Sequence, residues 1–318
     1  MSIRVASLFC GCGGMDMGFV NAGYDIVWAN DIDKYAVETY NHNFTTKAVC
    51  KDINIIDYDK IPEHDLLIGG FPCQPFSMMG LKEGFKDKKG RGELFYRFID
   101  VIDHQLCTYG KKPLALVLEN VRNLQKHDHG RTFEVIRSEL EKEGYTVHVE
   151  TLNSSDFGVP QTRRRTFIVA LLDNGYPYKF PKPEPTEKSM LNLLERDVDE
   201  KYYLSERVKK TILSTGTGGY YSKYDVNLKI GHPLTATMGK MHRAGEDNYV
   251  DDPVTKRLRK LTPRECARLQ GFEDSFIIPV SNAQAYKQFG NAVTVNVAQA
   301  IGNSLKGYFE KYGKTTDK

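Results

Sequence analysis

The chain lacks the features that mark secreted and membrane proteins. No run of about 18 apolar residues occurs in its 318 residues, so no membrane span is expected. The N-terminus has no basic stretch followed by a sufficient apolar core, which excludes a secretory signal. The six cysteines are irregularly spaced, which is typical of reduced thiols and not of a disulfide framework. We therefore expect a cytoplasmic protein.

Two ligand signatures are also missing. Cys10-Gly11-Cys12 has no second close pair and no histidine-rich partner, so no metal site is predicted. The dinucleotide fingerprint G-x-G-x-x-G fails, because Gly11 and Gly13 fit but Asp16 stands where the third glycine should be. The net charge of +3 by itself indicates no particular partner.

What the chain does have, up to residue 172, is a repeated alternation of short apolar runs and helical patterns. The runs at 3–9, 64–70 and 114–118 predict strands, and the last of them is too apolar for a solvent-facing edge. Repeated βα units with apolar strands indicate an α/β fold with a mainly parallel sheet that is covered on both faces.

The pattern changes after residue 172. Residues 173–185 carry four prolines, which is typical of a linker, and periodicity is poor from there to residue 253. This stretch predicts a smaller, irregular lobe with function on its loops. Helices then return: Thr262-Pro263-Arg264-Glu265 is a capping box, Ser281 begins a helix that Gly290 ends, and a last helix is expected over 294–309.

The most informative segment is Phe71-Pro72-Cys73-Gln74-Pro75, which follows the apolar run ending at Gly70. Each proline fixes its own φ and biases the preceding residue toward extended conformations. Cys73 is therefore placed where a strand ends and a loop begins, the edge at which open α/β sheets bind ligands. The alternatives are a nucleophile and an inert buried thiol.

A glycine-rich run, residues 9–14, connects the first predicted strand to the first predicted helix. Glycine lets the backbone turn sharply and approach a ligand closely. Asp31 ends the second strand and could accept hydrogen bonds from ribose hydroxyls, and Asp52 could receive an adenine amino group. A nucleoside without pyrophosphate fits this pattern. The alternative is a turn that only packs a helix on a strand.

Two polar clusters lie at the same predicted edge. Glu119-Asn120-Val121 follows a buried strand, so Glu119 is either a proton donor beside Cys73 or an acid at a helix N-terminus. Strand alternation places Arg163 and Arg165 on one face, where they could clamp a phosphate or steady a carboxylate; a solvated edge strand would look similar.

Taken together and in order, these segments resemble the DNA (cytosine-5)-methyltransferases of bacterial restriction–modification systems. The matching segments are Phe9-x-Gly-x-Gly-Gly14, Asp31, Asp52, Pro72-Cys73-Gln74, Glu119-Asn120-Val121, Gln161-x-Arg163-x-Arg165, residues 264–272 and Gly290-Asn291-Ala292-Val293. The resemblance implies a Rossmann-like, S-adenosylmethionine-dependent methyltransferase fold with a smaller, irregular, β-rich target-recognition domain. It places the catalytic domain at 1–175 plus 285–318, and the recognition domain and hinge at 176–284.

The resemblance also implies a reaction. The Cys73 thiolate would add to C6 of a cytosine flipped out of duplex DNA, and Glu119 would hold or donate a proton at N3. Arg165 would hold Glu119 and the base, and Asn120 would position the catalytic loop. The implied catalytic residues are Cys73, Glu119, Arg165, Arg163, Asn120 and Gln74.

The implied cofactor is S-adenosylmethionine. Its predicted contacts are Phe9, Gly11, Gly13, Gly14, Asp31, Ile32, Asp52, Ile53, Pro72, Leu94, Asn291 and Val293. The implied partner is double-stranded DNA, with predicted contacts at Ser77, Arg91, Thr235, Thr237, Arg257 and Arg264. We further expect a monomer in the bacterial cytoplasm, bound to the nucleoid through DNA, with a cognate restriction endonuclease as a functional partner.

Rival functions differ in what the chain should carry. An RNA cytosine-5 methyltransferase of the same fold would keep Cys73 and Glu119 but should lack a sizeable DNA-reading lobe, which residues 173–253 supply. The failed dinucleotide fingerprint counts against a nucleotide-dependent oxidoreductase. The presence of Cys73 and Glu119 counts against a DNA-binding module without activity.

Overall fold

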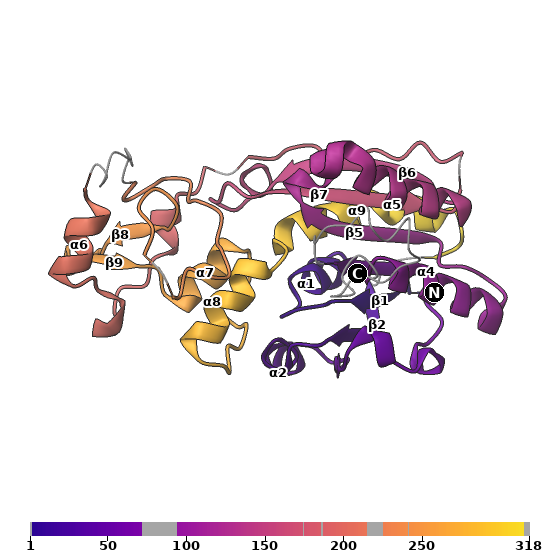
Figure 1. Cartoon of the computed structure of the whole chain (residues 1–318), viewed down its shortest axis with the longest axis horizontal. Coiled ribbons are helices and arrows are strands. Elements are labelled where there is room, and N and C mark those ends of the chain that lie inside the picture. Colours follow the sequence, from indigo (N-terminus) through magenta and orange to yellow (C-terminus); the bar gives the residue numbers. More distant parts are fainter. Residues whose placement is uncertain are drawn as a thin grey trace. The chain divides into compact units, whose positions relative to one another are not determined.

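The computed structural model describes residues 2–71, 94–173, 175–185, 187–214, 225–240 and 242–314. The chain forms two compact units (Figure 1). Unit 1 comprises 1–152, 164–182 and 297–318, and unit 2 comprises 153–163 and 183–296. The predicted domain bounds differ from these units mainly at 153–163 and 285–296, which lie in unit 2.

Unit 1 is built on a seven-stranded sheet with the order β3-β2-β1-β4-β5-β7-β6. The strands are β1 (Arg4–Leu8), β2 (Asp25–Asp31), β3 (Val49–Cys50), β4 (Leu66–Gly70), β5 (Ala115–Val121), β6 (Thr146–Asn153) and β7 (Arg164–Leu171). Neighbours from β3 to β5 pair in parallel, whereas β7 pairs antiparallel with β5. The α/β fold with a mainly parallel sheet is therefore confirmed.

Both faces of the sheet are covered. Ala6 and Leu8 of β1 belong to a buried cluster that also contains side chains of α4 (Tyr96–Tyr109) and α5 (Arg131–Lys142). Because side chains alternate along a strand, Ser7 points to the other face, where its hydroxyl donates to Asp16 of α1 (Gly14–Asn21). The sheet therefore lies between α4 and α5 on one face and α1 on the other.

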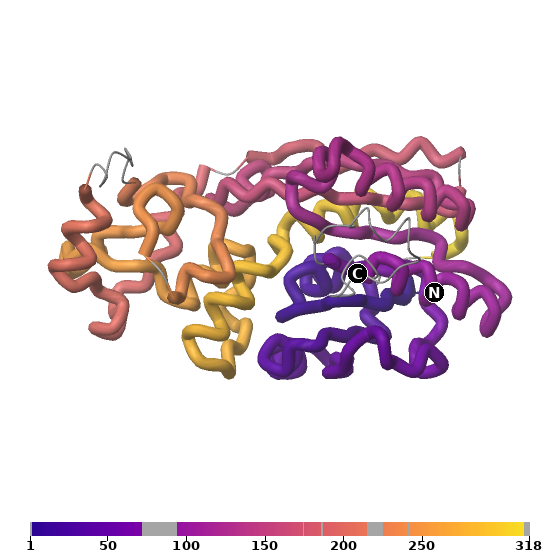
Figure 2. Tube along the Cα trace, in the orientation of Figure 1, coloured from indigo at the N-terminus to yellow at the C-terminus, as the bar shows by residue number. Residues whose placement is uncertain are grey.

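The C-terminal helix α9 (Val295–Glu310) returns to the N-terminal elements, as Figure 2 shows in yellow. The Tyr308 hydroxyl donates to the Leu114 carbonyl, 2.7 Å away, and the Tyr24 hydroxyl donates to the Gly302 carbonyl, 2.8 Å away. Within the described residues, no helix is both long and apolar enough to cross a membrane.

Helix ends in unit 1 follow the sequence rules. The Asp33 side chain caps α2 (Lys34–Asn43) by accepting from the backbone N–H groups of Tyr35 and Ala36. Gly23 and Gly144 follow α1 and α5 with φ values of 89° and 90°, a conformation that favours glycine. Short 3-10 turns are η1 (Ile53–Ile55), η2 (Tyr58–Lys60) and η4 (Arg122–Gly130).

Unit 2 is less regular. Its elements are η5 (Ser154–Asp156), η6 (Met190–Leu193), η7 (Glu200–Tyr202), α6 (Glu206–Ile212), β8 (Tyr249–Asp251), β9 (Leu258–Lys260), α7 (Pro263–Leu269) and α8 (Asn282–Asn291). Strands β8 and β9 form an antiparallel pair. The predicted capping box is confirmed at α7, where Thr262 and Glu265 each bond the other's backbone N–H.

Gly290 does not end α8, contrary to the sequence prediction, because the helix continues to Asn291. A β-carbon at Gly290 would lie 2.2 Å from the Thr235 carbonyl carbon and 2.3 Å from the Ala236 nitrogen. Glycine is therefore needed here because two backbones touch, and not because the helix stops.

Candidate active site

The loop between β1 and α1 is held open by left-handed backbone. Phe9, Gly11 and Gly13 have φ values of 56°, 57° and 92°. A β-carbon at Gly13 would lie 2.3 Å from the Phe44 ring, whereas one at Gly11 would meet no atom within 4 Å. Gly13 is thus a close-packing position, and Gly11 faces open space beside which a ligand fits. Gly14 opens α1.

Asp31 ends β2 and reaches this loop. Its carboxylate accepts from the backbone N–H of Gly11 and from that of Asp33, both at 2.8 Å. Burial raises the pKa of Asp31 above its ordinary value, against the effect of these two hydrogen bonds, which lower it. The neighbouring Ile32 is 67 % exposed, so an apolar surface lies directly beside the carboxylate.

Asp52 and Ile53 play different parts. The Asp52 side chain begins η1 by accepting from the backbone N–H and the side-chain amide of Asn54, both at 2.9 Å. Ile53 is buried in the core of unit 1.

Three features of this region together fit a nucleoside ligand. The loop is open at Gly11, the Asp31 carboxylate can bind hydroxyl groups, and the exposed Ile32 can pack on a base.

The loop also carries two cysteines. Cys10 and Cys12 are buried, and burial raises the pKa of both thiols, that of Cys12 to about 12. Across the described ranges, no group of three or more His, Cys, Asp or Glu side chains is placed to hold a metal ion.

Glu119 and Arg165 meet at the carboxyl edge of the central strands. Arg165 Nε lies 3.1 Å from Glu119 Oε1, and both side chains are mostly buried. The pairing is possible because β7 runs antiparallel to β5, which brings the start of β7 to the end of β5. Glu119 lies opposite Gly70, where a β-carbon would sit 2.9 Å from Glu119 Oε2. Gly70 therefore leaves room for the carboxylate.

Asn120 ties the ends of β4 and β5 together. Its side-chain amide donates to the Phe71 carbonyl, 3.0 Å away, and its side-chain oxygen accepts from the Val121 N–H at 2.9 Å. Phe71 is the last described residue before Cys73. The predicted site residues Pro72, Cys73, Gln74, Ser77 and Arg91 lie outside the described residues, and Leu94, which follows them, packs against the core of unit 1.

Arg163 does not share a strand face with Arg165, because β7 begins only at Arg164. Arg163 is 1 % exposed, and its guanidinium donates to the carbonyls of Leu234, Gly290 and Ala292 at 2.8, 2.9 and 2.9 Å. These contacts fix the backbone at residue 234 and at residues 290–292 of unit 2. They favour a positioning role over the catalytic role that the sequence predicted.

The remaining predicted cofactor and DNA contacts also lie in unit 2. Asn291 is exposed at the end of α8, and Val293 is buried just after it. Thr237 is exposed, and the Thr235 hydroxyl accepts from Arg243 at 2.6 Å. Thr235 and Thr237 are therefore presented on the same short turn.

The two predicted phosphate-binding arginines have protein partners. Arg257 is exposed and forms two hydrogen bonds with Glu200. Arg264 donates to the carbonyls of Glu273 and Phe276, at 3.2 and 2.7 Å. Each would have to exchange or share these partners to contact a phosphate.

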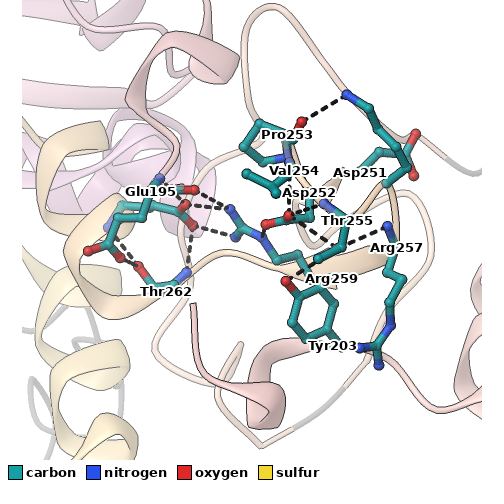
Figure 3. A network of polar contacts seen from close by, with 12 residues as sticks. Glu195, Tyr203, Asp251, Asp252, Pro253, Val254, Thr255, Arg257, Arg259 and Thr262 are labelled. Atoms are coloured by element: carbon teal, nitrogen blue, oxygen red, sulfur yellow. Dashed lines mark hydrogen bonds and ion pairs between the residues drawn. The ribbon is translucent and has the colours of Figure 1, made fainter. Parts of the chain in front are cut away.

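Sequence reasoning missed two buried charged residues, one in each unit. Arg259 lies in the basic run 256–260, yet it is fully buried between Asp252 and Glu265, and Figure 3 shows its guanidinium at the centre of this network. Asp16, noted only as a missing glycine, is fully buried behind the glycine loop. A signal was available only for Asp16, which stands between Met15 and Met17.

Comparison with known proteins covers almost the whole chain. The family model described as C-5 cytosine-specific DNA methylase matches residues 3–307. The Type II methyltransferase M.NlaX of Neisseria lactamica is 41 % identical over 312 residues, which are 95 % of this chain and 96 % of that protein. M.HhaI of Haemophilus parahaemolyticus is 34 % identical over 320 residues, 95 % and 94 % of the two chains.

Solved structures agree on the fold. The Entamoeba histolytica methyltransferase EhMeth has a TM-score of 0.78 at 21 % identity, covering 97 % of this chain and 99 % of its own. The Dnmt2 methyltransferase of S. pombe has a TM-score of 0.77 at 23 % identity, with the same coverage of both chains. At these identities the likeness supports the fold alone.

Proposed function

Since the chain belongs to the family of C-5 cytosine-specific DNA methylases, and is therefore a DNA cytosine-5 methyltransferase, we propose that Cys73 is its nucleophile. The methyl group of S-adenosylmethionine would be transferred to C5 of a cytosine flipped out of a specific duplex sequence, through a covalent bond between Cys73 Sγ and C6. The observation that carries this proposal is the ion pair between Glu119 and Arg165, whose Oε1 and Nε atoms are 3.1 Å apart. Glu119 lies opposite Gly70, and Gly70 precedes Cys73 by three residues in the sequence.

The glycine loop and the end of β2 are the proposed cofactor site. Phe9, Gly11, Gly13 and Gly14 would line it, Asp31 would bind the ribose, and Ile32 would pack on the adenine, with Asp52, Ile53, Pro72, Leu94, Asn291 and Val293 as further contacts. The open space at Gly11 and the exposed face of Ile32 support this fit. When bound, S-adenosylmethionine supplies an electrophilic methyl group.

The chain's own side chains perform the steps on the base. The Cys73 thiolate forms a bond to C6, and the electron pair of the C5–C6 double bond moves toward C5 while Glu119 holds a proton at N3. Arg165 keeps the Glu119 carboxyl oriented. Once C5 carries the methyl group, a base removes the proton that is still on C5. The C5–C6 double bond then re-forms, the C6–S bond breaks and the Cys73 thiolate is released. Asn120 would position the Cys73 segment through the Phe71 carbonyl.

Unit 2 is the proposed reader of the duplex. Thr235 and Thr237 would approach the bases from their exposed turn, while Arg257 and Arg264 would contact phosphates, as would Ser77 and Arg91. Such phosphate contacts give affinity that falls steeply with salt and carries no base information. We propose that the chain acts as a monomer beside a cognate restriction endonuclease.

Methyl transfer from labelled S-adenosylmethionine tests the proposal, with unmethylated plasmid DNA and bulk tRNA as alternative acceptors. We expect label in DNA and none in tRNA. Cys73→Ser should lose the activity but keep cofactor binding, because a serine hydroxyl is a far weaker nucleophile than a thiolate. Cys107→Ser is the matched control, since Cys107 is an exposed free thiol on α4.

The result that overturns the proposal is substantial DNA methylation by Cys73→Ser. Label in tRNA alone would favour the RNA-directed alternative instead. Bisulfite sequencing of DNA from cells that express the chain would then identify the target, and a duplex with 5-fluorocytosine at that position should form a denaturant-resistant adduct with Cys73.

A further inference from the structure

Asp16 is a fully buried carboxylate that the reaction does not use, and it lies in the first turn of α1 directly behind the glycine loop. We propose that Asp16 is a positioning residue that holds the loop from Phe9 to Gly14 in its cofactor-binding shape. This inference rests on the proposed function, since it assigns the support of the same cofactor site.

The carboxylate joins the two ends of the loop. Asp16 Oδ2 accepts from the Ser7 hydroxyl at 3.0 Å, and both residues are buried. Ser7 lies on β1 two residues before Phe9, and Asp16 lies on α1 two residues after Gly14. One hydrogen bond therefore fixes the separation between the strand that enters the loop and the helix that leaves it.

The second carboxylate oxygen fixes the wall of the loop. Asp16 Oδ1 accepts from the Tyr40 hydroxyl at 2.9 Å. The Tyr40 ring stacks on Phe44 with centroids 4.1 Å apart, and Gly13 packs against both rings. Rotation of Tyr40 would therefore move the surface against which Gly13 holds its left-handed conformation.

Among the described residues, no cation is a partner of Asp16: its two side-chain donors are the neutral hydroxyls of Ser7 and Tyr40. The titratable groups that interact with Asp16 include Tyr40, Asp31, Cys10 and Cys12, and none of these side chains can carry a positive charge. Burial raises the pKa of Asp16 to about 6, against hydrogen bonds from Tyr40 and Ser7 that lower it. What a carboxyl supplies here is two oxygens in fixed directions, which an apolar side chain cannot supply.

The test compares S-adenosylhomocysteine binding to the full chain, by calorimetry, in Asp16→Ala and Asp16→Asn. Loss of both hydrogen bonds in Asp16→Ala should weaken binding about tenfold or more and raise KM for S-adenosylmethionine, with kcat at saturation little changed. Asp16→Asn should stay near wild type, because its amide oxygen accepts from one hydroxyl while its NH2 donates to the other.

Two tyrosine variants complete the design. Tyr40→Phe should weaken binding by a smaller factor than Asp16→Ala, since it removes one of the two hydroxyls. Tyr24→Phe is the matched control: it removes a buried hydroxyl that donates to the Gly302 carbonyl at 2.8 Å, on the side of α1 that packs on α9, and should leave binding unchanged.

The inference fails if Asp16→Ala and Tyr40→Phe bind as wild type does, or if Asp16→Asn loses as much affinity as Asp16→Ala. If Asp16→Ala does not fold, Ser7→Ala and Tyr40→Phe decide the matter, and wild-type affinity in both overturns the inference. Absence of binding by the wild-type chain would overturn the proposed cofactor site, and the inference with it, which separates that failure from one confined to the variants.

Discussion

Asp16 in unit 1 and Asp252 in unit 2 are both fully buried carboxylates, but their partners differ in charge. Asp16 accepts from two neutral hydroxyls, whereas Asp252 accepts from the Arg259 guanidinium at 2.9 Å and from the backbone N–H groups of Val254 and Thr255. Burial raises the pKa of Asp252, but these hydrogen bonds outweigh it and lower the pKa to about 2. The pKa of Asp16 is instead raised to about 6.

The difference separates two uses of a buried charge. Arg259 links the turn at Asp252 to Glu265 of α7 and to the Glu195 carbonyl, so one guanidinium joins three stretches of unit 2 (Figure 3). In that network each carboxylate has the Arg259 guanidinium as its counter-charge, and the contacts fix the hairpin of β8 and β9. Above about pH 6, Asp16 carries a charge that no cation among its described partners balances, which costs stability and fits a residue kept for the loop it orients.

The largest expected effect comes from breaking the network in unit 2. Arg259→Met should lower the free energy of unfolding of unit 2 by about 3–5 kcal/mol, because it leaves Asp252 and Glu265 buried without their counter-charge. Urea unfolding of the full chain, followed by a signal from unit 2, measures the change.

Arg257→Met on the same hairpin is the matched control. Arg257 also pairs with a glutamate, Glu200, but both side chains are largely exposed, so the change should be small. An equal decrease in the free energy of unfolding in Arg259→Met and Arg257→Met would show that burial does not make the Arg259 ion pairs more important for stability.

The second prediction concerns pH. The folded pKa of Asp16 is raised, so the stability it contributes is fully present below the unfolded pKa, 3.8, and is lost as the pH rises through about 6. Asp16→Asn does not titrate. Its free energy of unfolding relative to wild type should therefore rise by about 1–2 kcal/mol between pH 5 and pH 8.

Asp252→Asn supplies the opposite case. Because the folded pKa of Asp252 is lowered to about 2, its carboxylate is ionised across that whole interval. The cost of Asp252→Asn should be constant from pH 5 to pH 8 and should shrink only as the pH falls below the unfolded value. Urea unfolding at both pH values measures each variant, and the burial-raised pKa of Asp31 cancels because every chain carries it.

The sequence predicted what depends on near neighbours. The Thr262–Glu265 capping box was identified correctly because a helix cap is decided within a few residues. The edge at which the end of β4 lies beside Glu119 of β5 follows from the parallel arrangement of strands that the apolar runs already indicated.

What the sequence could not supply depends on remote partners. Gly290 was taken as a helix stop because nothing in the chain shows that the Thr235 backbone, 55 positions earlier, touches it. Arg163 was predicted to lie on a strand face, but β7 begins only at Arg164. The sequence does not show this start, because it is set by pairing with the remote end of β5, where Val121 pairs with Arg165. From the sequence, the roles of Asp16 and Arg259 are not evident, because their partners Tyr40 and Glu265 are identified only in the folded structure.

The smallest expected effect comes from removing one of the hydroxyl groups that donate a hydrogen bond to each of the two carboxylates, Asp16 and Asp252. Thr255→Val removes the bond from the Thr255 hydroxyl to Asp252, at 3.1 Å, and should cost about 0.5–1 kcal/mol, because Arg259 and two backbone N–H groups remain. Ser7→Ala leaves Tyr40 as the remaining side-chain donor to Asp16, so its cost at pH 8 should be larger. Urea unfolding of both variants at pH 8 measures the difference, and a Thr255→Val loss equal to that of Ser7→Ala would show that the number of remaining donors does not distinguish the two sites.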